Sequence, residues 1–512
     1  MKKFKLIIYI FFAGLAACSG LEEETPKDTL FKLVSPAESG FEFTNNITNL
    51  KDFNIFLYRN FYNGGGVGIG DINNDGLADV YMTSNMEKNK LFLNKGDFQF
   101  EDITINSGSG GNHAWSTGVV FVDINSDGFL DIYVCNAGNV ENDNRNNELF
   151  INNGDLTFTE KAEEYGLNDN GCTTHAAFFD YDMDGDLDVY ILNNSFIPVN
   201  SLGFSNKREL RCEDWDMPDF FKTGGDKLLR NDNNKFVDVS EEAGIFGSLI
   251  GFGMGVTVGD INHDLLPDIY VSNDFYERDY LYINQGDGTF TEEIKERMNH
   301  ISLSSMGADM ADINNDGYPE IFVTDMLPEG DERLKNTSEF ERYNIYNLKQ
   351  ERDFYHQYMQ NTLQLNNQDG TFSEIGFYSG VAETDWSWGA LMLDMDNDGY
   401  RDIYVANGIY HDLTNMDFMN FFANEIVQRM TVSGKKEEID TIVNRMPSTP
   451  IPNYGFKNND GLTFSDVSKN WGLADISFSN GSAYGDLDND GDLDLVVNNI
   501  NQPAFLYKNR SD

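Results

Sequence analysis

Short apolar runs alternate with polar turns from about residue 30 to the C-terminus. Three of the runs are identical, with the letters DIYV at 131–134, 268–271 and 402–405. β-Branched and aromatic residues dominate the runs, and Gly, Asn and Asp fill the segments between them, as is typical of short strands joined by tight turns. The pattern predicts an all-β protein made of many short strands.

A second kind of run ends in Asn and is followed by a polar turn and a strand around Phe. The copies are LFLN at 91–94, LFIN at 149–152, LLRN at 228–231, LYIN at 281–284, LQLN at 363–366, GFKN at 455–458 and LYKN at 506–509. The last copy ends the chain without its Phe-bearing partner, and residues 30–34 (LFKLV) supply one at the other end. A repeat divided in this way predicts a seven-bladed β-propeller whose last blade is shared by the N- and C-terminal strands.

A nine-residue frame lies between the strands and occurs seven times. The copy DLDNDGDLD at 486–494 has Asp at its first, third, fifth and ninth positions and Gly at its sixth. Calcium takes about six to eight oxygen ligands, and a glycine allows the sharp turn that points alternate side chains inward. Position twelve is Val497 rather than the acid of an EF-hand, so the loop joins two strands. Each copy therefore predicts a calcium site.

We number the seven copies loops 1 to 7 in chain order. Their oxygen-bearing side chains are Asp71, Asn73, Asp75 and Asp79 in loop 1; Asp123, Asn125, Asp127 and Asp131 in loop 2; Asp180, Asp182, Asp184 and Asp188 in loop 3; Asp260, Asn262, Asp264 and Asp268 in loop 4; Asp312, Asn314, Asp316 and Glu320 in loop 5; Asp394, Asp396, Asp398 and Asp402 in loop 6; and Asp486, Asp488, Asp490 and Asp494 in loop 7. Leu265 replaces the glycine of loop 4, where the alternative is an Asp/Asn turn without metal.

The formal charge of −49 excludes a nucleic-acid binder on electrostatic grounds. The four ligand positions of the seven loops hold 24 of the acidic residues. Without metal these carboxylates repel one another, so we expect folding to be linked to calcium binding.

The N-terminus has the pattern of a targeting segment. Lys2, Lys3 and Lys5 precede an apolar stretch, and LAAC at 15–18 resembles a bacterial lipobox. This predicts a lipoprotein signal peptide at 1–18, lipidation of Cys18 and a flexible tether at 19–29; an ordinary signal peptide is the alternative. Ser19 after the Cys favours the outer membrane, and the acidic residues at 22–24 favour the cell surface. The lipid anchor would then be the contact with the membrane.

Three insertions interrupt the propeller at about 195–225, 325–360 and 409–453. All three leave the repeat between the strand after the metal loop and the next Asn-ending strand, so we expect them to gather on one face. Apolar spacing predicts helices at 416–430 and 435–446. Aromatic residues on this face could stack on sugar rings or hold a peptide; the alternative is a small accessory core. They are Trp215, Tyr355, His356, Trp386, Trp388, Tyr410 and His411.

No catalytic motif stands out, so no catalytic residue is predicted. Asp214, Asp216, His356 and His411 are acid or base candidates outside the metal loops, with nothing to fix their geometry. Cys172 and Cys212 could form one disulfide, whereas Cys135 in an apolar strand is expected to be buried.

The loops, the small residues before them and the strands after them resemble the FG-GAP/VCBS-repeat proteins, which include the propellers of integrin α-chains. The resemblance spans about residues 30–510, and it also extends to bacterial lipoproteins of the cartilage-acidic-protein-like (ASPIC/UnbV) group, although their C-terminal domain is not visible. It implies that position seven of each loop supplies a carbonyl ligand. These residues are Leu77, Phe129, Asp186, Leu266, Tyr318, Tyr400 and Asp492.

Two classes of function follow from the sequence. The first is a calcium-binding, non-catalytic module of the cell envelope that binds a glycan or protein ligand, or a partner in an outer-membrane uptake complex. The second is a calcium-dependent polysaccharide lyase or hydrolase. A fold by itself does not decide between them.

Overall fold

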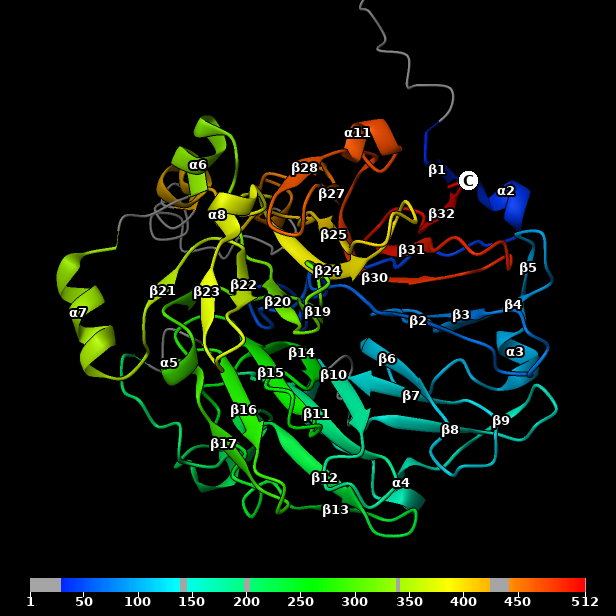
Figure 1. The fold of residues 1–512 in the computed structure, drawn as a ribbon, viewed down its shortest axis with the longest axis horizontal. Helices are drawn as coiled ribbons and strands as arrows, with labels where there is room; N and C mark the ends of the chain where they lie inside the picture. Colours follow the sequence, from blue (N-terminus) through cyan, green and yellow to red (C-terminus); the bar gives the residue numbers. More distant parts are fainter. Residues whose placement is uncertain (1–28, 139–144, 198–202, 338–340, 424–441, 512) are drawn as a thin grey trace, which may run out of the picture.

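The computed structural model describes residues 29–138, 145–197, 203–337, 341–423 and 442–511. Seven four-stranded antiparallel sheets stand around a common axis, as Figure 1 shows. The predicted seven-bladed β-propeller is confirmed.

The blades follow the chain order, each running from the axis outward. They consist of β2 (Val67–Gly70), β3 (Asp79–Met82), β4 (Lys90–Asn94) and β5 (Phe100–Asp102); β6 (Ser116–Val122), β7 (Asp131–Asn136), β8 (Glu148–Asn152) and β9 (Phe158–Glu160); β10 (Cys172–Phe179), β11 (Asp188–Asn194), β12 (Lys227–Asn231) and β13 (Phe236–Asp238); β14 (Gly253–Gly259), β15 (Asp268–Asn273), β16 (Tyr280–Asn284) and β17 (Phe290–Glu292); β19 (Ala308–Ala311), β20 (Glu320–Val323), β22 (Thr362–Asn366) and β23 (Phe372–Glu374); β24 (Ser387–Leu393), β25 (Asp402–Asn407), β27 (Tyr454–Asn458) and β28 (Phe464–Asp466); and β30 (Ser479–Gly485), β31 (Asp494–Asn499), β32 (Phe505–Asn509) and β1 (Phe31–Leu33).

The seventh blade closes the ring. Strand β1 pairs antiparallel with β32, with Phe31 opposite Asn509 and Leu33 opposite Tyr507. The two ends of the chain thus share one sheet, beside the C label in Figure 1, as the divided repeat predicted.

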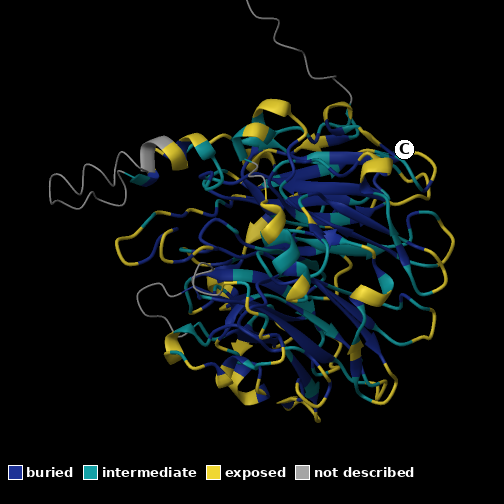
Figure 2. Ribbon diagram, turned by 90° about the vertical axis from the view of Figure 1, so that its left-hand side faces the viewer, coloured by how far each residue is buried: buried dark blue, intermediate teal, exposed yellow. Residues whose placement is uncertain are grey.

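The core lies between neighbouring blades. The second strand of each blade is buried along its whole length, because both of its faces pack against adjacent sheets. One cluster, for example, joins Tyr133 and Leu149 of blade 2 to Val189 and Ile191 of blade 3. Figure 2 shows the buried strands inside and the exposed residues concentrated in the turns.

Short helices join the blades or lie in the insertions. Single turns follow the outer strands at α2 (Pro36–Ser39), α3 (Thr104–Ser107), α4 (Ala162–Tyr165), α5 (Ile294–Arg297), α8 (Gly376–Ser379) and α11 (Ser468–Trp471). The insertions contain η3 (Cys212–Asp214), η4 (Asp219–Phe221), α6 (Asp331–Thr337), α7 (Tyr343–Glu351) and η5 (Phe418–Ala423). Two short strand pairs join an insertion to a segment between blades: β21 (Gln357–Tyr358) with β18 (Ile301–Ser302), and β26 (Ile451–Pro452) with β29 (Ile476–Ser477).

The two faces of the ring differ. The metal loops connect the first and second strands of each blade, whereas the insertions connect the second and third strands at the opposite end. The segment 41–66 also lies on the insertion face, where Phe53, Tyr58 and Phe61 pack with Trp115 and with Ile409 of the third insertion. We call this segment the plug and this side the plug face. The sequence did not predict the plug, which belongs to no repeat.

The structure tests the two predictions about cysteines. The predicted disulfide between Cys172 and Cys212 is wrong: both thiols are free and buried, and they belong to separate apolar clusters. Cys135 is buried as expected. The predicted signal peptide, Cys18, nearly all of the tether, the second half of the helix at 416–430 and most of the helix at 435–446 lie outside the described residues. Residues 416–423 are helical, as predicted. Among the described helices, none has the length and apolar character needed to cross a bilayer.

Candidate metal sites

All seven metal loops have the same backbone geometry. In loop 7 the two carboxylate oxygens of Asp486 accept hydrogen bonds from the N–H groups of Asp490, at 3.2 Å, and Gly491, at 3.0 Å. The corresponding pair recurs in the other six loops. The sixth residue has a positive φ in every loop, which explains the glycine there. Leu265 in loop 4 adopts φ 69° with the same hydrogen bonds, so the loop keeps its shape at a cost in strain.

The acid at position nine closes each loop. In loop 7, Asp494 accepts N–H groups from Leu487 at 2.9 Å and from Asn509 at 2.8 Å. Burial raises the pKa of these acids, and the neighbouring loop carboxylates add to the shift. The pKa is about 8 for Asp494 and Glu320, about 7 for Asp79, Asp188, Asp268 and Asp402, and about 6 for Asp131. A nearby cation would favour their ionised form.

Three loops gather carboxylates closely enough to hold a metal ion. In loops 3, 6 and 7 the acids at positions one, three and nine each offer an oxygen, and these oxygens lie within 4.8 Å of one another. In the same three loops the Oδ1 atom at position three is buried without a hydrogen-bond partner: Asp182, Asp396 and Asp488. Buried, unpartnered carboxylate oxygens in a cluster of acids suit a hard cation such as calcium. The residues therefore fit a calcium site; in the other four loops, which have Asn at position three, calcium binding stays a prediction.

The Asn that ends the third strand joins the loops of adjacent blades, a role that the sequence did not reveal. Asn152 donates from Nδ2 to the Ile72 carbonyl of loop 1, at 2.7 Å, and to the Leu130 carbonyl of its own loop, at 3.1 Å. The corresponding Asn makes the bond to the preceding loop in blades 1, 4, 5, 6 and 7. The repeated Asn was visible in the sequence, but its partners are distant in the chain.

The residue at position four of a metal loop links it to the next loop. We call these links the belt; it lies on the face opposite the plug face. Asn489 of loop 7 donates to the Gly76 carbonyl of loop 1 at 2.7 Å, and Asn74 of loop 1 donates to the Gly128 carbonyl of loop 2 at 2.9 Å. Asn315 and Asn397 make similar links from loops 5 and 6, and His263 joins loop 4 to loop 5. Position four has a positive φ in all seven loops, a conformation that Asn tolerates well. Loops 2 and 3 have Ser126 and Met183 there, and no such link is seen among the described residues.

The predicted ligand-binding aromatics do not form one group. Trp386 and Trp388, each 7% exposed, lie in the plug cluster, with Tyr410 packed against it. His411 contacts Tyr62 of the plug. Trp215 is buried in a separate cluster of the first insertion, and Tyr355 and His356 are half-buried in the second. Buried rings offer little surface to a ligand; ligand binding by these residues stays a prediction.

The acid and base candidates are also dispersed. Asp214 and Asp216 belong to the first insertion, His356 to the second and His411 to the third. Among the described residues no hydrogen bond or ion pair joins any two of these four. His356 instead shares a hydrogen bond of 2.9 Å between its Nδ1 and the Tyr346 hydroxyl.

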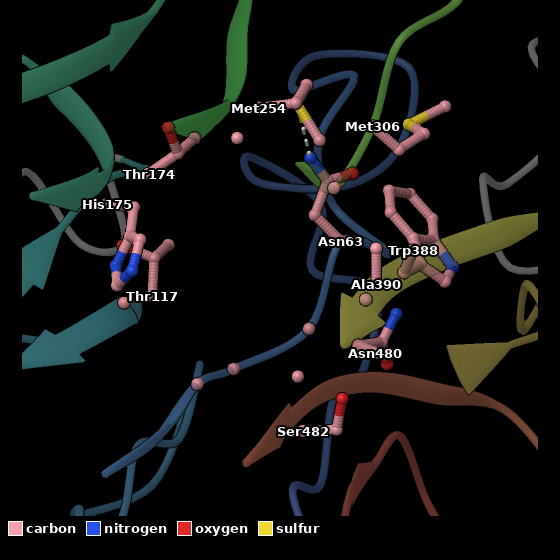
Figure 3. A pocket seen from close by; sticks show the side chains of 18 of the residues that line it. Asn63, Thr117, Thr174, His175, Met254, Met306, Trp388, Ala390, Asn480 and Ser482 are labelled. Atoms are coloured by element: carbon pink, nitrogen blue, oxygen red, sulfur yellow. Dashed lines mark hydrogen bonds between the residues drawn. The ribbon is translucent and has the colours of Figure 1, made fainter. Parts of the chain in front are cut away.

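A cavity of about 370 Å³ lies on the ring axis and is lined by the innermost strands of all seven blades. In six blades a glycine lies where the innermost strands of neighbouring blades approach one another most closely. A Cβ on Gly481, for example, would lie 2.3 Å from the Gly65 carbonyl oxygen. The third blade has His175 there, whose Nδ1 is buried without a hydrogen-bond partner. Figure 3 shows His175, Thr117 and Thr174 on one side of the cavity and Trp388, Asn480 and Ser482 on another.

Comparisons with known proteins agree with this geometry. A model of the FG-GAP-like repeat matches residues 71–134, 137–191, 266–323 and 354–405. Cartilage acidic protein 1 of Xenopus tropicalis is 30% identical over 169 residues, which are 32% of this chain and 25% of that protein. The match thus spans a quarter of the relative's length.

Solved structures with a similar outline include two crystal structures of BBS1N in complex with ARL6DN, one soaked with mercury and one with lead. Each has a TM-score of 0.42 and covers 88% of this chain, at 9% and 10% identity, over 94% and 92% of the respective solved chain. The repeats, the ring and the aspartate loops together identify the chain as an FG-GAP-like repeat β-propeller with distant similarity to cartilage acidic protein 1.

Proposed function

We propose that this protein is a calcium-binding, non-catalytic module of the cell envelope. The observation that carries the proposal is the set of unpartnered carboxylate oxygens at position three of loops 3, 6 and 7, each inside a cluster of three acids. Calcium bound there would neutralise these acids and fix the loops to which the strand-ending Asn residues donate hydrogen bonds. The metal would therefore act on the rigidity of the ring rather than on a substrate.

The proposed anchor is a lipid on Cys18, which would hold the ring at the outer membrane, exposed at the cell surface. The proposed ligand is a glycan or a protein that binds the plug face. This face presents apolar side chains to solvent: Phe56 is 52%, Leu57 55% and Phe220 47% exposed. Phe220 packs on Phe196, whose ring stacks on Tyr58 of the plug, so the exposed ring of Phe220 continues the aromatic cluster beneath it. Exposed apolar groups of this kind are typical of binding surfaces.

Ligand binding can be tested with glycan arrays and a surface-display pull-down, using the wild-type chain and a Phe56→Ala/Leu57→Ala variant. Ile105→Ala is the matched control, because Ile105 is 94% exposed on α3 and belongs to neither of the apolar clusters that contain plug residues. We expect a specific ligand that the plug variant loses and the control retains. Equal binding by both variants would contradict the assignment of the face.

Catalysis is tested on uronic-acid polysaccharides by the ultraviolet absorbance of unsaturated chain ends. The proposal expects no turnover with calcium present. A rise in absorbance that chelation abolishes would contradict a non-catalytic module and favour a calcium-dependent lyase. Membrane anchoring is tested by labelling with a radioactive fatty acid, with a Cys18→Ala variant as control; label on the variant would contradict the proposed lipidation.

A further inference from the structure

Two lysines contact the metal loops of blades 6 and 7. Lys508 forms ion pairs with Asp488 and, at 3.4 Å, with Asp490, which are positions three and five of loop 7. Lys457 makes the same pair of contacts in loop 6, with Asp396 and, at 2.8 Å, with Asp398. The Asp488 side chain is only 10% exposed, and its second oxygen has no hydrogen-bond partner. The ammonium group therefore lies beside the oxygens that would face calcium.

The seven repeats show that these lysines are matched to the charge of their loops. Each lysine immediately precedes the strand-ending Asn. In blade order this position holds Leu93, Ile151, Arg230, Ile283, Leu365, Lys457 and Lys508, while position three of the metal loop holds Asn73, Asn125, Asp182, Asn262, Asn314, Asp396 and Asp488. The three blades with Asp at position three have a basic residue, and the four with Asn have an aliphatic one. The added base offsets the added acid, so every loop keeps the same net charge at these positions.

The third blade differs in its geometry. Arg230 pairs with Asp232, at 2.8 Å, and both side chains lie at the surface. It forms no ion pair with Asp182 or Asp184 within the described structure, so its charge acts on Asp182 without direct contact, whereas the lysines contact the acids of loops 6 and 7. Position seven does not separate the loops in the same way, because Asp186 of loop 3 has a counterpart in Asp492 of loop 7. Among the three loops with a carboxylate triad, loop 3 is therefore the one left most open to an added cation.

We propose that Lys457 and Lys508 are tethered counter-cations that neutralise loops 6 and 7 when calcium is absent and compete with calcium when it is present. The inference rests on the proposed calcium sites. A lysine ammonium on its four-carbon stem can satisfy two carboxylates and can move aside for a divalent ion. Loop 7 belongs to the blade that the two chain ends share, and loop 6 is its neighbour. The lysines therefore stabilise the closure of the ring when calcium is low. Loop 3, without this competitor, binds calcium more tightly than loops 6 and 7.

The test compares Lys457→Met, Lys508→Met and the double variant with wild type, in the full chain. Methionine keeps most of the aliphatic stem and removes the ammonium, which in Lys508 also lies 5.0 Å from the centroid of the Phe98 ring. Lys95→Met is the matched control, because Lys95 is 52% exposed and its contact with Glu101 spans 4.0 Å. Calcium affinity is measured by isothermal titration after chelation, and melting temperature is measured in EDTA and in saturating calcium.

We expect the double variant to melt at a lower temperature than wild type in EDTA but not in calcium. Two of its calcium sites should bind about tenfold more tightly, the order expected when a unit charge near a divalent ion is removed. Lys95→Met should change neither quantity. An equal loss of melting temperature with and without calcium, or unchanged affinities, would show that the lysines only pack against the loops and would overturn the proposal.

A charge swap gives an independent check. Asp488→Asn/Lys508→Leu installs in loop 7 the pair that blade 1 has naturally, Asn73 with Leu93. We expect Asp488→Asn alone to weaken calcium binding at loop 7, and Lys508→Leu to tighten it less in that background than in wild type, a coupling between the two sites. Strictly additive effects would contradict the counter-cation role. If wild type binds no calcium at all, the proposed function itself fails, whereas calcium binding that ignores both lysines overturns only this inference.

Discussion

The strand-ending Asn is expected to make one of the largest single contributions to the stability of the ring. Asn152 is 3% exposed, and its side chain makes three hydrogen bonds: Nδ2 donates to the carbonyls of Ile72 and Leu130, and Oδ1 accepts from the Gly154 N–H at 2.9 Å. Asn152→Ala leaves two enclosed carbonyls without this donor. At about 1–3 kcal/mol for each unsatisfied group, we expect a loss of roughly 3–5 kcal/mol in the free energy of unfolding.

The assay is urea unfolding in saturating calcium, followed by far-ultraviolet circular dichroism and tryptophan fluorescence. Asn153→Ala is the matched control: Asn153 is exposed, and its side chain bonds only to Thr157 in the adjacent turn and Thr159 in β9, so we expect a change of at most about 0.5 kcal/mol. The reasoning would be refuted if Asn152→Ala lay within 1 kcal/mol of this control, a margin of about the size of one net hydrogen bond. Ile72 belongs to blade 1, so the result measures a contact between blades.

Three further predictions concern stability. Leu265→Gly should stabilise the chain by about 1 kcal/mol, because φ 69° strains a leucine, while Gly317→Ala at φ 91° should destabilise it by a similar amount; thermal melts with opposite signs from these would contradict the strain. Met183→Asn should extend the belt from loop 3 and raise the melting temperature, whereas Asn315→Met should lower it; a null result for both variants would remove the belt as a stabilising feature. Burial raises the pKa of Asp226 and of Asp279 to about 7, above the unfolded value near ~4, so their stabilising contribution is present below pH ~4 and is lost as the pH rises through about 7. Asp226→Asn/Asp279→Asn copies Asn147 of blade 2, which donates to the Tyr133 hydroxyl at 2.9 Å; it should be more stable than wild type at pH 8, and a less stable variant at that pH would contradict the sign.

The repeats explain why so much of the fold could be predicted from sequence. A strand-ending Asn and an aspartate loop recur in each blade, so counting them gives the number of blades. The seventh repeat is divided between the two ends of the chain, which predicts closure by β1. The plug could not be predicted in this way, because it occurs once and its aromatic residues, such as Phe53 and Tyr58, gain meaning only from the rings they contact.

Sequence reasoning identified the candidate metal ligands within each loop but not the residues that contact the loops from elsewhere in the chain. The loop frame identified the acids at positions one, three and nine that the structure brings together in loops 3, 6 and 7. The roles of Asn152, Asn74 and Lys508 were not predicted, since each contacts a metal loop that is 20 or more residues away in the chain. The pairing of Cys172 with Cys212 failed because spacing in a sequence does not show that two thiols lie in different clusters.

The central claim is that calcium in the aspartate loops stabilises the ring. The most direct measurement is the calcium content of the folded chain at saturation, by mass spectrometry of the metal, together with the melting temperature before and after chelation. The account predicts at least three bound ions for each chain, one for each aspartate triad, and a clear fall in melting temperature in EDTA that added calcium reverses. A chain that retains no calcium and melts at the same temperature in EDTA would contradict it.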